Sequence, residues 1–125
     1  MNRAPCLLLL LTLACNREQP APATPQAAAP AADSHAAARQ LITQYGCNIC
    51  HVIPGTEGAQ GSLGPALAGV ASRPTLSEGS VQNTPANLAQ FIQNPASLNP
   101  QTSMPPISIT DDDAQTIAAY LQTLK

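Results

Sequence analysis

The chain has 125 residues, a formal net charge of −2 and five basic residues, and its aromatic side chains are two Tyr and one Phe. So few basic residues form no patch or stripe, which excludes recognition of a nucleic-acid backbone as the basis of function. A small domain with few aromatic residues has a thin hydrophobic core. Such domains are usually stabilised by a disulfide, a metal or a cofactor.

Residues 1–14 have the pattern of an export signal. Arg3 supplies a short positive region, and the apolar run that follows it is too short to span a bilayer. The run ends in LTLAC (residues 11–15), which resembles a bacterial lipobox, although Thr12 stands where Leu is commonest. We therefore expect cleavage before Cys15 and a lipid on its thiol. Ordinary signal cleavage at the same point is the alternative, and it would leave an unpaired cysteine at the new N-terminus.

Residues 15–35 are expected to form a lipid-anchored linker. Ala and Pro dominate this stretch and no hydrophobic period appears, so no packed structure is predicted for it. A flexible chain of this length spans on the order of 25 Å. The folded domain is predicted to occupy residues 36–125, on the periplasmic side of a bacterial membrane and free to reorient there.

A helix is predicted over residues 36–45, with Ala37, Leu41, Ile42 and Tyr45 near one face. The motif CNICH, which comprises Cys47, Asn48, Ile49, Cys50 and His51, follows directly. Two thiols at this spacing with an adjacent histidine are compatible with a zinc site, a redox-active disulfide or covalent attachment of a haem.

The rest of the chain bears on this choice. Cys6 lies in the signal and Cys15 is assigned to lipid, so Cys47 and Cys50 are the thiols left for the domain. A structural zinc site needs four ligands, and neither a second C-x-x-C nor a paired histidine motif follows. A thioredoxin-like pair belongs in a βαβ setting, whereas no period-two strand pattern occurs here. The pattern therefore favours covalent attachment of haem c.

The spacing of CNICH suits that chemistry. Each thiol adds to one vinyl group of the porphyrin, and one turn of helix separates the thiols of Cys47 and Cys50. His51 is then carried beneath the iron as an axial ligand. The export signal agrees with this interpretation, because covalent haem attachment is typical of compartments outside the cytoplasm.

The second predicted helix runs from Pro85 to about Asn94. Its apolar residues are Leu88, Phe91 and Ile92, which recur at helical spacing. The proline that follows Asn94 favours an end at this point.

The opposite face of the iron is either open or occupied by a second ligand. Met104 is the one methionine left after removal of the signal, and it lies beside two prolines in a stretch without a helical pattern. A methionine that only fills a core usually lies on a periodic helix face. We therefore expect Met104 to be the second axial ligand, which with histidine raises the reduction potential. His35 is a weaker candidate because it precedes the helix that leads into CNICH.

The last predicted helix begins after Thr110, a natural N-cap with Asp113 at the capping-box position. Its apolar stripe comprises Ile117, Tyr120, Leu121 and Leu124. The three aspartates of residues 111–113 do not converge on one point, and their charge complements the helix dipole. They are therefore not expected to form a catalytic or metal site.

Residues 36–125 resemble a small class I bacterial cytochrome c with one haem and His/Met ligation. CNICH matches the haem-binding motif of that family, and GPALAG (residues 64–69) is similar to its G-P-x-L-x-G loop. Met104 matches the distal ligand in SMPP (residues 103–106). The resemblance implies an all-α, class I cytochrome c fold, with three to five helices wrapped around one covalently bound haem c.

The resemblance also implies roles for single residues. The Pro65 carbonyl would accept a hydrogen bond from the non-ligating nitrogen of His51, which fixes the ring orientation and makes the ligand more basic. Arg73 falls where the family often has an arginine that faces a haem propionate. A solvated loop charge is the alternative for this residue.

One part of the family pattern is altered in this chain. The first helix of the family usually crosses the last through a glycine and an aromatic residue, where this chain has Ala38 and Ile42. Tyr120 matches the aromatic partner on the last helix. We expect the crossing to persist, because Ala is small and Ile is bulky and apolar.

The function implied by the resemblance is single-electron transfer, without enzymatic activity. Expected partners are redox proteins such as a terminal oxidase, a reductase or a dehydrogenase, and the protein is expected to be a monomer. The surface near the haem edge, formed by Asn48, Ile49, Pro65 and Ala66, is nearly uncharged, so docking cannot depend mainly on an acidic patch of the partner. The alternatives are a haem-based sensor or peroxidase-like enzyme with a displaceable Met104, and an assembly subunit that binds haem without shuttling electrons.

Overall fold

The computed structural model describes residues 31–58, 60–77, 79 and 81–125. The predicted signal, the proposed lipid site at Cys15 and most of the predicted linker lie outside these residues. The described part is all-α, as predicted, and its elements are α1 (Ala31–Gln44), α2 (Cys47–Cys50), the 3-10 helix η1 (Val70–Ser72), α3 (Pro85–Gln93), α4 (Pro95–Leu98) and α5 (Asp111–Leu121). None of these helices is long and apolar enough to cross a membrane.

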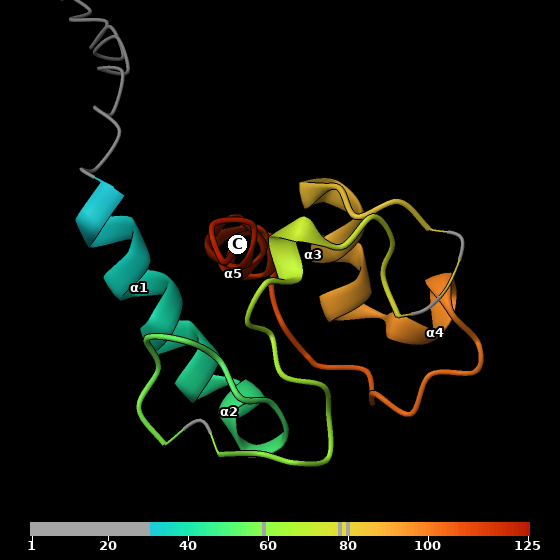
Figure 1. Ribbon diagram of the computed structural model, residues 1–125, viewed down its shortest axis with the longest axis horizontal. Helices are drawn as coiled ribbons and strands as arrows, with labels where there is room; N and C mark the ends of the chain where they lie inside the picture. The colour runs from blue at the N-terminus through green and yellow to red at the C-terminus, as the bar shows by residue number, and fades with distance from the viewer. Residues whose placement is uncertain (1–30, 59, 78, 80) are drawn as a thin grey trace, which may run out of the picture.

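Helix α5 is the centre of the packing. It lies between α1 and α3 and packs against both (Figure 1). Ala38 and Ile42 of α1 are completely buried, and Ile117 and Tyr120 of α5 are almost completely buried. The predicted crossing of the first and last helices is therefore present, with alanine and isoleucine at the positions where the family has glycine and an aromatic residue.

Helix α1 differs from the prediction at its N-terminal end and on its buried face. It begins at Ala31, inside the stretch predicted to be unstructured linker, and not at Ala36. Ala37 was expected on the apolar face, but it is exposed and Ala38 is buried in its place. The ring of His35 packs edge-on against Tyr120, with 5.4 Å between the ring centroids. The physical reason for the early start is the run of alanines, which favours a helix without showing an apolar period.

Helix α5 begins at its predicted cap, and helix α3 begins at Pro85 as predicted, after a cap at Thr84 that the sequence analysis did not identify. The Thr84 hydroxyl accepts a hydrogen bond of 3.1 Å from the Asn87 backbone N–H, ahead of a proline in the first turn. The Thr110 hydroxyl accepts one of 3.2 Å from the Asp113 backbone N–H. The apolar residues expected on both helices are buried, except that Leu124 is half-buried and lies beyond the end of α5.

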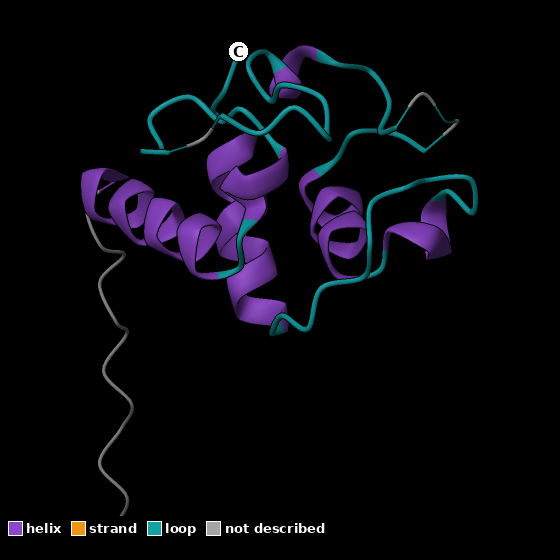
Figure 2. Ribbon diagram, turned by 90° about the horizontal axis from the view of Figure 1, so that it is seen from below, coloured by secondary structure: helices purple, strands orange, loops and turns teal. Residues whose placement is uncertain are grey.

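Long loops join the helices and arch over one side of the bundle (Figure 2). Their one extended pairing among the described residues is an isolated bridge between Thr75 and Gln82. Of the residues predicted to bind a cofactor, Cys47 and Cys50 lie on α2, and the others lie in the segments from His51 to Arg73 and from Asn99 to Thr110. These segments therefore decide the geometry of the site.

Candidate functional site

A cavity of about 1390 Å³ opens between the loops and the helices. Its walls include all four residues predicted to bind a haem, namely Cys47, Cys50, His51 and Met104. Arg73 and Pro65 also line it. Its apolar floor is supplied by α3 and α5, through Leu88, Phe91, Ile92, Ile117 and Leu121. The structure therefore brings together residues from both halves of the domain around one apolar space.

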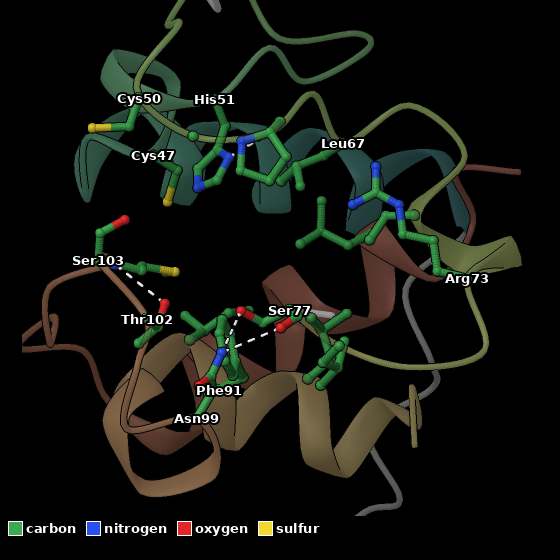
Figure 3. A pocket seen from close by; sticks show the side chains of 18 of the residues that line it. Cys47, Cys50, His51, Leu67, Arg73, Ser77, Phe91, Asn99, Thr102 and Ser103 are labelled. Atoms are coloured by element: carbon green, nitrogen blue, oxygen red, sulfur yellow. Dashed lines mark hydrogen bonds between the residues drawn. The ribbon is translucent and has the colours of Figure 1, made fainter. Parts of the chain in front are cut away.

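The two thiols lie on a single helical turn. Gly46 has a φ of 71°, a left-handed conformation that ends the run of α1 and starts α2. The His51 backbone N–H closes the turn on the Cys47 carbonyl at 2.9 Å, and His51 itself is extended. The Cys47 sulfur points into the space between the walls, while the Cys50 sulfur lies at its edge (Figure 3).

The His51 ring is oriented by the loop of residues 64–67. Its Nδ1 lies 2.7 Å from the Pro65 carbonyl oxygen, so the Nδ1–H donates and Nε2 keeps its lone pair. The loop is held on both sides of Pro65, because Gly64 N–H donates to the Cys50 carbonyl at 2.9 Å and Leu67 N–H donates to the Val52 carbonyl at 2.8 Å. A ring fixed in this tautomer offers Nε2 to a metal.

Gly64 makes this approach possible. A Cβ atom at this position would lie 2.4 Å from Cε1 and 2.6 Å from Nδ1 of His51. Sequence reasoning identified the loop but not this contact, because the motif does not show which atom of the loop faces the imidazole.

The state of the Cys47 thiol argues against a redox-active pair. Burial raises the pKa of the Cys47 thiol above its ordinary value, so the thiol is protonated at neutral pH. Reactive C-x-x-C cysteines have a lowered pKa, since the thiolate is the nucleophile. An apolar cavity beside a protonated Cys47 thiol suits a large apolar group better than a disulfide exchange reaction.

Met104 belongs to the wall across from His51. It is half-buried, and its backbone N–H donates to the Thr102 hydroxyl at 3.2 Å. Thr102 and Ser103, which precede it, lie across the cavity from His51 (Figure 3). The competing candidate His35 packs on Tyr120 instead.

Arg73 lines the cavity and also contacts the proximal loop. Its Nη2 donates to the Ala66 carbonyl at 2.6 Å, next to the carbonyl that faces His51. Sequence reasoning left Arg73 open between a propionate contact and a solvated loop charge, and it did not foresee this bond. It also missed Asn83, whose amide donates to the Val70 and Arg73 carbonyls and accepts from Gln122.

Two apolar side chains are exposed beside the thiols without lining the cavity. Ile49 is 71% exposed and Val52 is 42% exposed. Leu63 is also exposed, but it lines the cavity, so a bound group would contact it.

The comparisons with known proteins agree with this geometry. A family model described as Cytochrome c matches residues 35–125. The chain belongs to the cytochrome c family. A cytochrome c carries haem c bound covalently through the thiols of its C-x-x-C-H motif, and here that motif is Cys47 to His51.

A solved structure supports the fold of this cytochrome c. The c-type cytochrome SorU from Sinorhizobium meliloti is similar over 74% of this chain and 92% of its own, with 22% sequence identity and a TM-score of 0.52. The search of curated proteins returned no match. The family supports electron transfer by a bound haem as the general function of this cytochrome c.

Proposed function

We propose that this cytochrome c is a single-electron carrier whose haem is bound through Cys47 and Cys50 and ligated by His51 and Met104. The observation that carries the proposal is that these four side chains line one cavity, with the thiols and His51 on one wall and the segment of Met104 on the other. The haem supplies the one-electron change between ferric and ferrous iron. The protein supplies fixed ligands, so that little reorganises when the charge changes.

Each of these residues has a distinct part in that role. The Pro65 carbonyl holds the Nδ1 proton of His51 and so orients Nε2. Met104 would hold the iron from the wall across from His51 and would exclude exogenous ligands. Arg73 lines the cavity with its charge, which suits a haem propionate, while its Nη2 holds the Ala66 carbonyl.

The axial role of Met104 is tested by spectroscopy of the ferric protein. The wild type should show the weak far-red charge-transfer band of methionine-ligated iron, and Met104→Ala should lose the band and lower the reduction potential. Leu98→Ala is the matched control, because Leu98 is also a partly buried apolar residue packed on the core and does not line the cavity. Rapid binding of carbon monoxide by the reduced wild type would instead favour a sensor or an enzyme.

The docking surface of this carrier is weakly charged. Apart from the ligand His51, residues 40–72 contain a single acidic or basic residue, Glu57, and the exposed apolar side chains Ile49 and Val52 lie beside the thiols. Redox partners bind through small interfaces. We therefore expect the respiratory redox partner to recognise this carrier by apolar contact. Oxidation of the reduced carrier by host membranes should then depend little on ionic strength. A steep fall in that rate with added salt would contradict this.

We assign the protein to the periplasmic side of a bacterial membrane, with a lipid anchor on Cys15. Cytochrome c domains are typically exported, and the sequence of residues 11–15 resembles a lipobox. Labelled fatty acid should enter the wild type and not Cys15→Ser. Equal labelling of the two, or none in the wild type, would rule out the anchor.

A further inference from the structure

The side chain of Asn99 connects the loop that carries Met104 to the turn that contains Ser77, by hydrogen bonds. Its Nδ2 donates to the Ser77 carbonyl at 3.2 Å and to the Ser77 hydroxyl at 3.0 Å, across 22 residues of sequence. Its Oδ1 accepts from the Gln101 backbone N–H at 3.0 Å. Asn99 and Ser77 both line the cavity, on the wall away from His51 (Figure 3).

Ser77 has an unusual backbone conformation. Its φ is 49°, and it is the one non-glycine residue with a positive φ among those the structure describes. Residues with a Cβ atom adopt this region only when their surroundings hold them there. The residue held in this conformation is the one whose carbonyl and hydroxyl both face the amide of Asn99.

A continuous series of hydrogen bonds leads from Asn99 to Met104. The Asn99 carbonyl accepts from the Thr102 backbone N–H at 3.0 Å. The Thr102 hydroxyl in turn accepts from the Met104 backbone N–H at 3.2 Å. Movement of Met104 away from the cavity therefore displaces a loop whose first residue is bonded to a different segment of the chain.

We propose that Asn99 is a positioning residue for Met104, and that its bonds to Ser77 slow the departure of Met104 from the iron. The inference rests on the proposed function, in which Met104 is an axial ligand. Asn99 acts through the loop, since the sulfur and not the amide is the ligand. The bonds between Asn99 and Ser77 thus help to hold Met104 in the position from which it excludes exogenous ligands.

The test is Asn99→Asp in the haem-bound protein, because aspartate keeps Oδ1 for Gln101 and removes the donor to Ser77. Loss of a hydrogen bond of this kind predicts carbon monoxide binding to the ferrous protein that is roughly three- to tenfold faster. As the pH is raised, the ferric methionine band should also be lost at a lower pH in Asn99→Asp than in the wild type. The matched control is Asn94→Asp, which makes the same change at an exposed residue whose side chain caps nothing.

A second variant, Ser77→Gly, weakens the same tie from the other side. Glycine accepts a positive φ and keeps the carbonyl, but it removes the hydroxyl acceptor, so both measurements should shift in the same direction by a smaller factor. If Asn99→Asp is folded and matches Asn94→Asp in both measurements, the proposal is wrong. If Asn99→Asp does not fold, an unchanged Ser77→Gly overturns it. Rapid carbon monoxide binding by the wild type would instead refute the proposed function itself.

Discussion

Gly64 is the residue on which the position of the His51 ring most directly depends. The imidazole lies against the glycine so closely that any side chain there would overlap Cε1 and Nδ1. A packed interior relieves such an overlap by moving the group that is free to rotate. Here that group is the His51 imidazole, whose orientation decides whether it can bind the iron. The glycine that opens the GPALAG motif therefore has a steric role in the site.

Gly64→Ala should turn the ring away from the Pro65 carbonyl and weaken the bond of His51 to iron. We expect a larger high-spin fraction in the visible and electron paramagnetic resonance spectra of the ferric protein. Gly69→Ala serves as the control, since its added Cβ meets nothing within 4 Å while its φ of 69° carries ordinary backbone strain. Spectra of Gly64→Ala that match those of Gly69→Ala would contradict the steric role.

The residues of the site could be predicted from sequence where they lie in short contiguous motifs. Cys47, Cys50 and His51 are set by the spacing of CNICH, and the contact of His51 with Pro65 followed from the resemblance of the loop. The bond between Asn99 and Ser77 could not be predicted. It joins two irregular loops, and neither partner has a sequence pattern that specifies the other.

Among the elements, the helices with caps and an apolar period were predicted well. Helix α3 starts at Pro85 and α5 starts after Thr110, as predicted, although the cap at Thr84 was not predicted. The start of α1 was missed because alanine favours a helix without adding to a hydrophobic pattern. Helix α4 was missed because four residues are too few to show a period.

A hydrogen bond joins the end of α1 to the start of α5. The Tyr45 hydroxyl donates to Oδ2 of Asp113 at 2.6 Å. The pKa of Tyr45 is raised above 10.0, first by this hydrogen bond and to a smaller extent by burial and by the negative charge of Asp113. Asp113, expected at a capping-box position, thus uses its carboxylate to connect two helices.

The raised pKa of Tyr45 predicts a pH dependence of stability above pH 10. The folded state holds the phenol proton more tightly than the unfolded state, so the stabilisation is complete below the unfolded pKa and is lost as pH rises through the folded pKa. The melting temperature of the wild type should therefore fall more steeply above pH 10 than that of Tyr45→Phe. Parallel curves for the two proteins would show that the bond does not contribute.

At the scale of the whole molecule, the cavity replaces much of the core. Buried apolar residues surround it, and they include Ile42, Leu88, Phe91 and Ile117. The space of about 1390 Å³ is not enclosed, so without a bound group water would contact these apolar side chains. Their burial against a bound haem is therefore part of what stabilises the fold.

The double variant Cys47→Ser with Cys50→Ser should therefore lose more than its covalent haem. We expect it to retain little cooperative tertiary structure, as measured by near-ultraviolet circular dichroism, thermal unfolding and amide hydrogen exchange. Cys15→Ser is the control, because it removes a thiol outside the domain and should leave haem content unchanged. A cooperative unfolding transition in the haem-free double variant would contradict this dependence.

The packing of α1 on α5 also sets an order of events during biogenesis. Ala38 and Ile42 are buried against α5, a helix that begins at Asp111, well after CNICH in the chain. A chain that emerges N-terminus first exposes CNICH before α5 exists, and the core cannot close until the last turn of that helix has arrived. We expect Cys47 and Cys50 to be accessible to haem attachment during this interval. The position of α5 after CNICH would thus give the chain a time in which its cofactor can be installed before the core closes.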